Sequence, residues 1–351
     1  MLRTLLRILT VTLLLLCAIG GWWLFLDGRA PAVRTDLTRM PDAFGAPPEG
    51  YPTENALMAA FATGTLDLLD REAPVAVPEG VIEELDITYG QEGDIALKLD
   101  LYRPEVSTTP LPAILFIHGG GWTKGDKSDY KFYAAKLPLN GYVVATMGYR
   151  FADVSGFPGC VSDTKCAVRW LRANAERLGI DPNKIAVAGG SAGGYLAMMA
   201  GYTSDVPELE GNGGNPDVSS AVQAVIDLYG PTDLTTEVAQ VHPTITNFMK
   251  VSYAQDPSRY EAASPLFHVD ADAPPTFIIQ GTLDTLVTPD QSDALAEKFQ
   301  ALGVEYWYDC YPGWPHTMDV ARPVNERVQE TLHAFLQHVF SENNEPESTI
   351  P

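Results

Sequence analysis

From Val81 onward, short apolar segments alternate with segments of helical periodicity, and this alternation constrains the fold more than any other feature of the chain. Runs such as Ala113–Ile117 are apolar throughout, which is typical of strands covered on both faces of a parallel sheet. We therefore predict an α/β fold with a mostly parallel central sheet of about eight strands and helices on both faces. The expected strands are Val81–Tyr89, Ile95–Tyr102, Ala113–Ile117, Val143–Met147, Ile185–Ala188, Ala224–Leu228, Thr276–Ile279 and Glu305–Tyr311.

Helices are expected between and after these strands, and the first two strands are expected to form a hairpin around Gly90–Gly93. The longest insertion in the alternation is Leu234–His268, which we predict to be a small cap over a substrate pocket. Its candidate capping side chains are Phe248, Met249, Tyr253 and Tyr260. The expected helices are Ser162–Arg177, Ala192–Tyr202, Gln291–Ala301 and Val324–Phe340.

The chain has 351 residues, which allows one main domain over residues 81–340. Residues 29–80 are rich in proline, so an extended connector is expected there. Within this connector, Thr53–Asp70 has the pattern of one short helix with Thr53 as its N-cap. Residues 341–351 are expected to be a flexible tail.

The sequence pattern at the N-terminus predicts a membrane anchor over residues 1–28. Arg3 and Arg7 precede the uncharged apolar run Ile8–Leu26, whose 19 residues nearly span a hydrocarbon core of roughly 30 Å. This arrangement places the main domain outside the cytoplasm, in a periplasmic or extracellular space. The alternative is a signal peptide that is cleaved near Ala30–Ala32, which would make the protein secreted.

The charge and the cysteines exclude some kinds of partner and cofactor. The net charge of -22 repels phosphate backbones, so no nucleic-acid partner is expected. The cysteines have neither paired spacing nor neighbouring histidines, so we expect no zinc site and no other metal. Cys160 and Cys166 are near enough in sequence to form a disulfide in an oxidising compartment, or to be two ordinary core residues. The four cysteines are Cys17, Cys160, Cys166 and Cys310.

The candidate nucleophile is Ser191. It lies in Gly189–Gly193, a G-x-S-x-G sequence between the predicted strand Ile185–Ala188 and the predicted helix Ala192–Tyr202. A serine at such a sharp strand-to-helix turn is exposed at the helix N-terminus, and small neighbours are needed because larger side chains would collide with the strand and helix.

A second glycine-rich segment, His118–Trp122, directly follows the apolar strand Ala113–Ile117. Consecutive glycines allow backbone N–H groups to point at a ligand without steric cost, which suits a developing oxyanion. We expect Gly120 and Gly121 to provide two such donors and Ala192 to provide a third.

A serine needs a base, and the base needs a carboxylate that orients it. Asp284 follows the predicted strand Thr276–Ile279, and His316 follows the next strand, so both lie at carboxyl ends of strands, where α/β sites assemble. We predict that Asp284 and His316 complete a triad with Ser191 in the chain order Ser, Asp, His. Asp290 and Asp309 are the alternatives to Asp284, and they are expected to be solvated or structural.

With these segments, the chain resembles the HGGGW-type esterase/lipase branch of the α/β-hydrolase superfamily, and most of all its feruloyl-esterase-like (BD-FAE) group. The likeness runs from about Glu84 to Phe340 and includes Leu99–Pro104, Val168–Arg172 and Gly281–Val287 in addition to the glycine-rich segments. The resemblance implies an α/β-hydrolase fold and hydrolysis of small-molecule carboxylic esters by Ser191, Asp284 and His316, with no cofactor. The matching segments do not define the acyl or alcohol group, or the oligomeric state.

Two other functions agree with the same residues. An amidase, formamidase or peptidase-like enzyme would use the same triad for acyl transfer. A non-catalytic binding module of the same fold is the alternative from a different class, although such modules commonly lack a triad member and this chain has a candidate for each.

Overall fold

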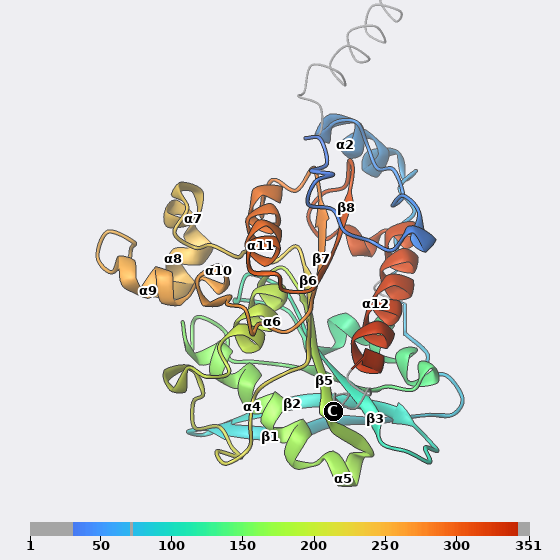
Figure 1. Cartoon of the computed structure of the whole chain (residues 1–351), viewed down its shortest axis with the longest axis vertical. Helices are drawn as coiled ribbons and strands as arrows, with labels where there is room; N and C mark the ends of the chain where they lie inside the picture. Colours follow the sequence, from blue (N-terminus) through green and yellow to red (C-terminus); the bar gives the residue numbers. More distant parts are fainter. Residues whose placement is uncertain (1–30, 71–72, 343–351) are drawn as a thin grey trace, which may run out of the picture.

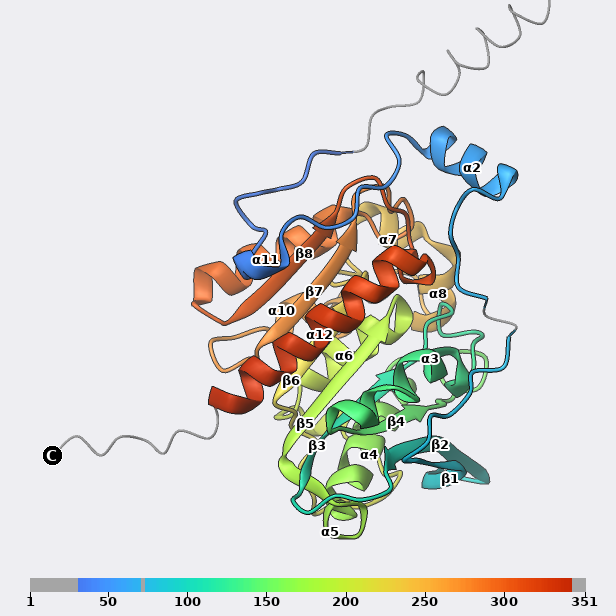
Figure 2. The ribbon, with the colours of Figure 1, turned by 90° about the vertical axis from the view of Figure 1, so that its right-hand side faces the viewer.

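The computed structural model describes residues 31–70 and 73–342, which form an eight-stranded sheet with helices on both faces (Figures 1 and 2). The strand order is β1-β2-β4-β3-β5-β6-β7-β8. The pairs β1–β2 and β2–β4 are antiparallel, and every later pair is parallel. The strands are β1 (Val81–Glu92), β2 (Ile95–Pro104), β3 (Leu111–Ile117), β4 (Val143–Met147), β5 (Ile180–Gly190), β6 (Ala224–Leu228), β7 (Thr276–Gly281) and β8 (Tyr306–Tyr311).

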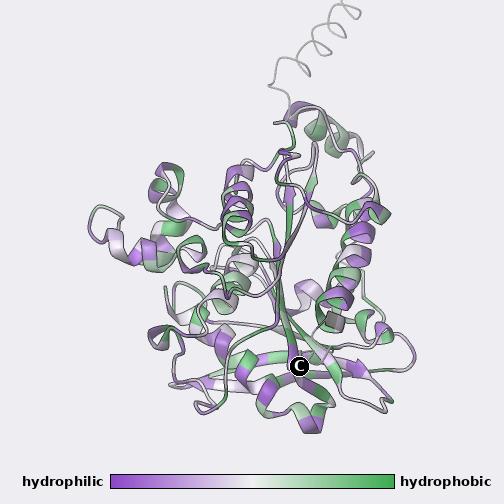
Figure 3. Cartoon of the chain, in the orientation of Figure 1, coloured by the Kyte–Doolittle hydropathy of each residue, from purple (hydrophilic) through white to green (hydrophobic). Residues whose placement is uncertain are grey.

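Alternate side chains of each central strand enter two separate cores. In β3, Leu115 and Ile117 pack in one core, and Ile114 and Phe116 pack in the other. Successive side chains of a strand point to opposite faces of the sheet, so each of these strands contributes to both cores. This explains why the central strands are apolar throughout. In Figure 3 the central strands are mainly coloured as hydrophobic, β1 and β2 are mixed, and the helices alternate between the two colours as amphipathic helices do.

The helices complete the two layers. Helices α4, α6 and α11 contribute to the core that contains Leu115, and α3 and α12 contribute to the core that contains Phe116. The main helices are α2 (Glu54–Thr63), α3 (Lys131–Ala134), α4 (Gly159–Ala173), α5 (Ala175–Leu178), α6 (Ala192–Tyr202), α11 (Pro289–Leu302) and α12 (Arg322–Glu342). Four short helices lie between β6 and β7, namely α7 (Glu237–Val241), α8 (Pro243–Met249), α9 (Pro257–Ala262) and α10 (Pro265–His268). The 3₁₀ turns are η1 (Asp42–Phe44), η2 (Lys127–Tyr130), η3 (Leu137–Asn140), η4 (Pro207–Leu209) and η5 (Met318–Val320).

The sheet and its helical layers confirm the predicted fold, but several predicted boundaries are wrong. The hairpin turn is shorter than expected, because β1 continues to Glu92 and β2 begins at Ile95. The helix expected over Ser162–Arg177 is two helices, α4 and α5, which meet at Asn174. Helix α12 continues to Glu342, two residues into the predicted tail. Residues 343–351 lie outside the described residues.

The predicted connector helix over Thr53–Asp70 ends much earlier, at Thr63. Its N-cap is as expected, because the Thr53 hydroxyl accepts a hydrogen bond from the N–H of Ala56 at 3.1 Å. Gly64 then adopts the left-handed conformation that closes a helix (φ 67°), and residues 65–70 contain no helical turn. Leu68 forms an isolated bridge with Ala321 instead of a helical turn.

Cys160 and Cys166 are both in α4, and both are buried free cysteines, as is Cys310. Of the two possibilities for this pair, the structure therefore shows two core residues and no disulfide. Six positions along one helix turn the two side chains to different sides, out of reach of each other. The predicted anchor over residues 1–28 lies outside the described residues, and none of the helices within 31–70 and 73–342 is long and apolar enough to cross a bilayer.

Candidate active site

Ser191 lies at the turn between β5 and α6, with backbone angles of φ 57° and ψ -122°. The glycines around it are required by close contacts. A Cβ atom on Gly189 would lie 2.6 Å from the carbonyl oxygen of Ile117, and one on Gly193 would lie 2.0 Å from the same atom. Strand β3 therefore leaves no room for a side chain at either position, and this packing holds Ser191 in a conformation that a serine otherwise avoids.

The hydroxyl of Ser191, the imidazole of His316 and the carboxylate of Asp284 lie in series. The distance from His316 Nε2 to Ser191 Oγ is 2.8 Å, and the distance from His316 Nδ1 to Asp284 Oδ2 is 2.6 Å. Asp284 is 2% exposed, and its other oxygen accepts backbone hydrogen bonds from Leu286 and Val287, each at 2.9 Å. These bonds fix the carboxylate at the carboxyl end of β7 and direct Oδ2, which also accepts a bond from Gln280 Nε2 at 3.4 Å, at the imidazole.

The glycine loop His118–Trp122 packs directly on the turn that carries Ser191. A Cβ atom on Gly119 would lie 3.4 Å from the Cβ atom of Ser191. Gly120 and Gly121 have φ values of 109° and 60°, a region that favours glycine. Their backbone lines the same cavity as Ser191 and Ala192, and Ala192 is the first residue of α6, where backbone N–H groups lack partners within the helix.

His118 is held within its own loop by contacts with Gly119 and Tyr149. Its Nδ1 lies 2.8 Å from the carbonyl oxygen of Gly119, and its ring stacks on Tyr149 with a centroid distance of 4.4 Å. Burial lowers the pKa of His118, which keeps the ring neutral. The Tyr149 hydroxyl also donates to the carbonyl oxygen of His118 at 3.0 Å, so two contacts from Tyr149 hold the start of the loop.

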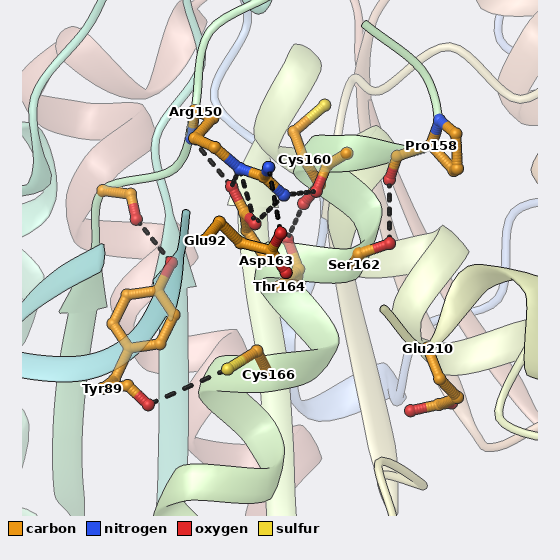
Figure 4. A network of polar contacts seen from close by, with 12 residues as sticks. Tyr89, Glu92, Arg150, Pro158, Cys160, Ser162, Asp163, Thr164, Cys166 and Glu210 are labelled. Atoms are coloured by element: carbon orange, nitrogen blue, oxygen red, sulfur yellow. Dashed lines mark hydrogen bonds and ion pairs between the residues drawn. The ribbon is translucent and has the colours of Figure 1, made fainter. Parts of the chain in front are cut away.

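A polar network fixes the chain next to Tyr149 (Figure 4). The backbone N–H of Arg150 donates to Asp163 of α4 at 2.9 Å, and its guanidinium Nη2 donates to the other oxygen of that carboxylate at 2.6 Å. The guanidinium also reaches Glu92 of β1 at 3.3 Å. Asp163 is 1% exposed, so this ion pair is buried and joins α4 to the segment that supports the glycine loop.

A cavity of about 820 Å³ opens over Ser191 and His316. The predicted cap contributes to it, but through other residues than expected. Phe248 and Tyr260 are fully buried in the core, where Phe248 stacks on Trp122 with a centroid distance of 4.3 Å. The cap residues that line the cavity belong to α7, α8 and the residues next to them, namely Thr236, Val238, Ala239, His242, Thr244 and Ile245, and Asp233 lines it just before the cap begins.

Two residues of the site were not predicted, Tyr229 and Asp319. The ring of Tyr229 packs edge-on against His316 with a centroid distance of 4.8 Å, and its hydroxyl donates to Asp319. Burial and the nearby carboxylate of Asp319 raise the pKa of Tyr229 well above its usual value, so the hydroxyl keeps its proton. Tyr229 directly follows β6, so the rule that identified Asp284 at the carboxyl end of a strand also applies to it.

The structure thus brings Ser191, Asp284 and His316 into hydrogen-bonding contact. Asp309, one alternative to Asp284, instead forms a buried ion pair with Arg327 at 2.7 Å, which is the structural role expected for it. Asp290 lies in the first turn of α11. Among the residues that the structure describes, no group of three His, Cys, Asp or Glu side chains is arranged to hold a metal ion.

The chain is similar to known esterases. The chain is 32% identical to the probable carboxylic ester hydrolase LipM of Mycobacterium tuberculosis over 73% of this chain and 61% of LipM. It is 30% identical to the esterase LipQ of the same organism over 83% of this chain and 70% of LipQ. The match therefore spans about three fifths of the length of LipM.

A solved structure also superposes well on most of the chain. A thermophilic esterase from Thermogutta terrifontis has a TM-score of 0.65 and 26% identity, with 80% of this chain and 100% of that esterase covered. The BD-FAE family model matches residues 99–299, which include Ser191, Asp284 and both glycine-rich segments. The chain belongs to the BD-FAE family, and its fold is that of the α/β-hydrolase superfamily.

Proposed function

We propose that this protein is a serine-dependent carboxylic ester hydrolase that works through an acyl-enzyme. The observation that carries the proposal is the contact series of Asp284, His316 and Ser191, with distances of 2.6 and 2.8 Å, beside a cavity lined by the glycine loop. The names of the relatives, which are esterases and carboxylic ester hydrolases, support the same reaction class.

In the first half of the reaction, His316 Nε2 removes the proton of Ser191 as Oγ attacks the ester carbonyl carbon. Asp284 accepts the proton of His316 Nδ1 in a hydrogen bond, which fixes the tautomer that leaves Nε2 free as a base. The backbone N–H groups of Gly120, Gly121 and Ala192 stabilise the oxyanion, and one such donor contributes roughly 3 kcal/mol to the transition state. The tetrahedral intermediate then collapses, and His316 gives its proton to the departing alkoxide.

In the second half, His316 removes a proton from a water molecule, which attacks the acyl carbon of Ser191. The same amides stabilise the second oxyanion, and collapse releases the carboxylic acid and restores the serine hydroxyl. Every step uses protein groups and water alone. A cavity of about 820 Å³ falls within the range of small-molecule sites, which supports an ester of low molecular mass as the substrate.

Replacement of Ser191 by alanine tests the proposal. Loss of the nucleophile should lower the kcat for p-nitrophenyl acetate by on the order of 10⁴- to 10⁶-fold, with an unchanged melting temperature. Ser107→Ala, in the exposed turn between β2 and β3, is the matched control and should keep full activity.

A fluorophosphonate probe separates the alternatives. The wild-type enzyme should be labelled once per chain, and Ser191→Ala should not be labelled. Absence of labelling in the wild type would favour a non-catalytic module, whereas faster turnover of p-nitroanilides than of p-nitrophenyl esters would favour an amidase.

A further inference from the structure

The histidine loop, Pro312–Ala321, joins β8 to α12 and carries His316. Its only regular structure is the 3₁₀ turn η5, Met318–Val320. Proton transfer requires His316 Nε2 to stay within hydrogen-bonding reach of Ser191, so an irregular loop of this kind needs external contacts that fix it.

The first part of the histidine loop is held by the segment just before α2. The N–H of Gly50 donates to the carbonyl oxygen of Pro312 at 2.9 Å, and the N–H of Tyr51 donates to that of Gly313 at 2.8 Å. The indole N–H of Trp314 donates in return to the carbonyl oxygen of Pro48 at 2.9 Å. Three consecutive loop residues, up to two positions before His316, are therefore bonded to one short segment.

The fit at this first contact is close. A Cβ atom on Gly50 would lie 2.3 Å from the carbonyl oxygen of Gly313 and 2.8 Å from the ring of Trp314. The ring of Tyr51 packs edge-on against that of Trp314 with a centroid distance of 6.0 Å. The absence of a side chain at position 50 thus allows the backbone of the segment to lie directly on the histidine loop.

The last part of the histidine loop is held by the segment just after α2. The N–H of Leu69 donates to the carbonyl oxygen of Val320 at 2.8 Å, and Leu68 forms a bridge with Ala321. The N–H of Arg322, the first residue of α12, donates to the carbonyl oxygen of Asp67 at 2.9 Å. One continuous segment, Pro48–Leu69, therefore contacts the histidine loop on both sides of His316.

This segment lies outside residues 99–299, which the family model covers. Helix α2 connects its two contact points at the end of the molecule where the strands β7 and β8 terminate (Figures 1 and 2). Only Leu57 and Ala60 of α2 are buried, so the helix itself adds little core. The segment is therefore attached to the protein mainly by the hydrogen bonds on either side of α2, and less by the packing of α2 itself.

We propose that Pro48–Leu69 is a positioning strap that fixes the histidine loop in its catalytic conformation. The inference rests on the proposed function, because it assigns His316 as the base. A loop without the strap would spend part of its time with His316 away from Ser191, and kcat would fall in proportion to the lost fraction. The residues of Pro48–Leu69 do not line the cavity, so substrate binding, and with it KM, should change little.

Two substitutions loosen the first contact. Gly50→Ala introduces a methyl group that collides with Gly313, and Tyr51→Ala removes the ring that packs on Trp314. Each should lower kcat for p-nitrophenyl acetate by about 10- to 100-fold, the size expected for a misplaced catalytic group, with KM within about twofold of wild type. Tyr51→Phe keeps the ring and should restore kcat, and Phe61→Ala on the exposed face of α2 is the control that should leave kcat unchanged.

The rate and the end point of fluorophosphonate labelling separate this proposal from simpler explanations. If the strap is loosened, the variants should react with the probe more slowly than wild type but should reach the same final stoichiometry of labelling. If part of the protein is unfolded, the final stoichiometry should be lower. Wild-type kcat in folded Gly50→Ala and Tyr51→Ala would overturn the strap, as would an equal loss in Phe61→Ala. A wild-type enzyme that is not labelled would instead contradict the proposed function itself.

Discussion

At the scale of single residues, Asp227 lies in a buried environment that disfavours the ionised form of its carboxyl group. It is fully buried at the carboxyl-terminal part of β6, where the N–H of Gly230 donates to Oδ1 at 2.9 Å. Burial raises its pKa from 3.8 to about 8, and the single bond from Gly230 offsets this only in part. Asp227 is therefore protonated in the folded protein at neutral pH, whereas it is ionised in the unfolded chain.

This difference predicts how stability changes with pH. Between about pH 4 and pH 8 the unfolded chain releases a proton from Asp227 that the folded protein keeps, so this residue lowers the free energy of unfolding as pH rises, by at most about 1.4 kcal/mol per unit. Asp227→Asn removes this loss, so its melting temperature relative to wild type should rise steadily from pH 4 to pH 8. Asp94→Asn, in the exposed β1–β2 turn, is the control. A constant difference between Asp227→Asn and wild type across this range would show that Asp227 does not titrate as described.

The triad residues were predictable from sequence because each follows a recognisable strand or lies in a recognisable segment. Tyr229 and Asp319 were not predicted for a physical reason. Tyr229 follows a predicted strand, as Asp284 does, but its contact with the His316 ring and its hydrogen bond to Asp319, 90 positions away, join segments that no local pattern pairs.

At the scale of elements, the ion pair of Arg150 and Asp163 joins α4 to the segment that supports the glycine loop. Asp163 is buried, so its removal would leave the Arg150 guanidinium without its main partner. Breaking a buried pair on one side typically costs 3 to 5 kcal/mol, whereas an exposed pair contributes about 0 to 1 kcal/mol.

Asp163→Ala should therefore lower the free energy of unfolding by about 3 kcal/mol in urea titrations. Asp36→Ala, which removes an exposed partner of Arg34, should leave the free energy of unfolding almost unchanged. Because Tyr149 precedes Arg150 and contacts His118, Asp163→Ala should also reduce kcat. A stability loss no larger than that of Asp36→Ala would show that the buried pair is not what holds these elements together.

The wrong element boundaries also have physical causes. The apolar residues after Gly64 suggested a longer helix, but Gly64 ends it, and Leu68 and Leu69 bond to the histidine loop instead. In the cap, Phe248 was among the side chains expected to cover the pocket, yet it is buried against Trp122. Both differences come from contacts between segments that are distant in sequence.

At the scale of the whole molecule, the alternation of strands and helices was enough to predict the sheet, its layers and the end at which the site lies. The order of the strands and the path of residues 31–70 were not predictable, because hydrogen bonds between distant strands decide them. Residues 31–70 bond to β8 and to the histidine loop mainly through backbone groups, which all residues except proline carry in full, so no residue type marks these contacts in the sequence.

The position of β8 as the last strand of the described sheet has a consequence for heat inactivation. Ser191 follows the interior strand β5, but His316 follows β8, whose outer edge forms only a short backbone pairing, between Tyr308 and Arg39, within the described residues. Edge strands of a sheet unfold locally at a lower free energy than interior strands. Turnover should therefore be lost at a temperature several degrees below the melting temperature measured by circular dichroism. Cooling after such mild warming should restore turnover in full, because β5 and Ser191 would have stayed folded. Loss of turnover and of the circular dichroism signal at the same temperature would mean that the edge and the interior of the sheet unfold together.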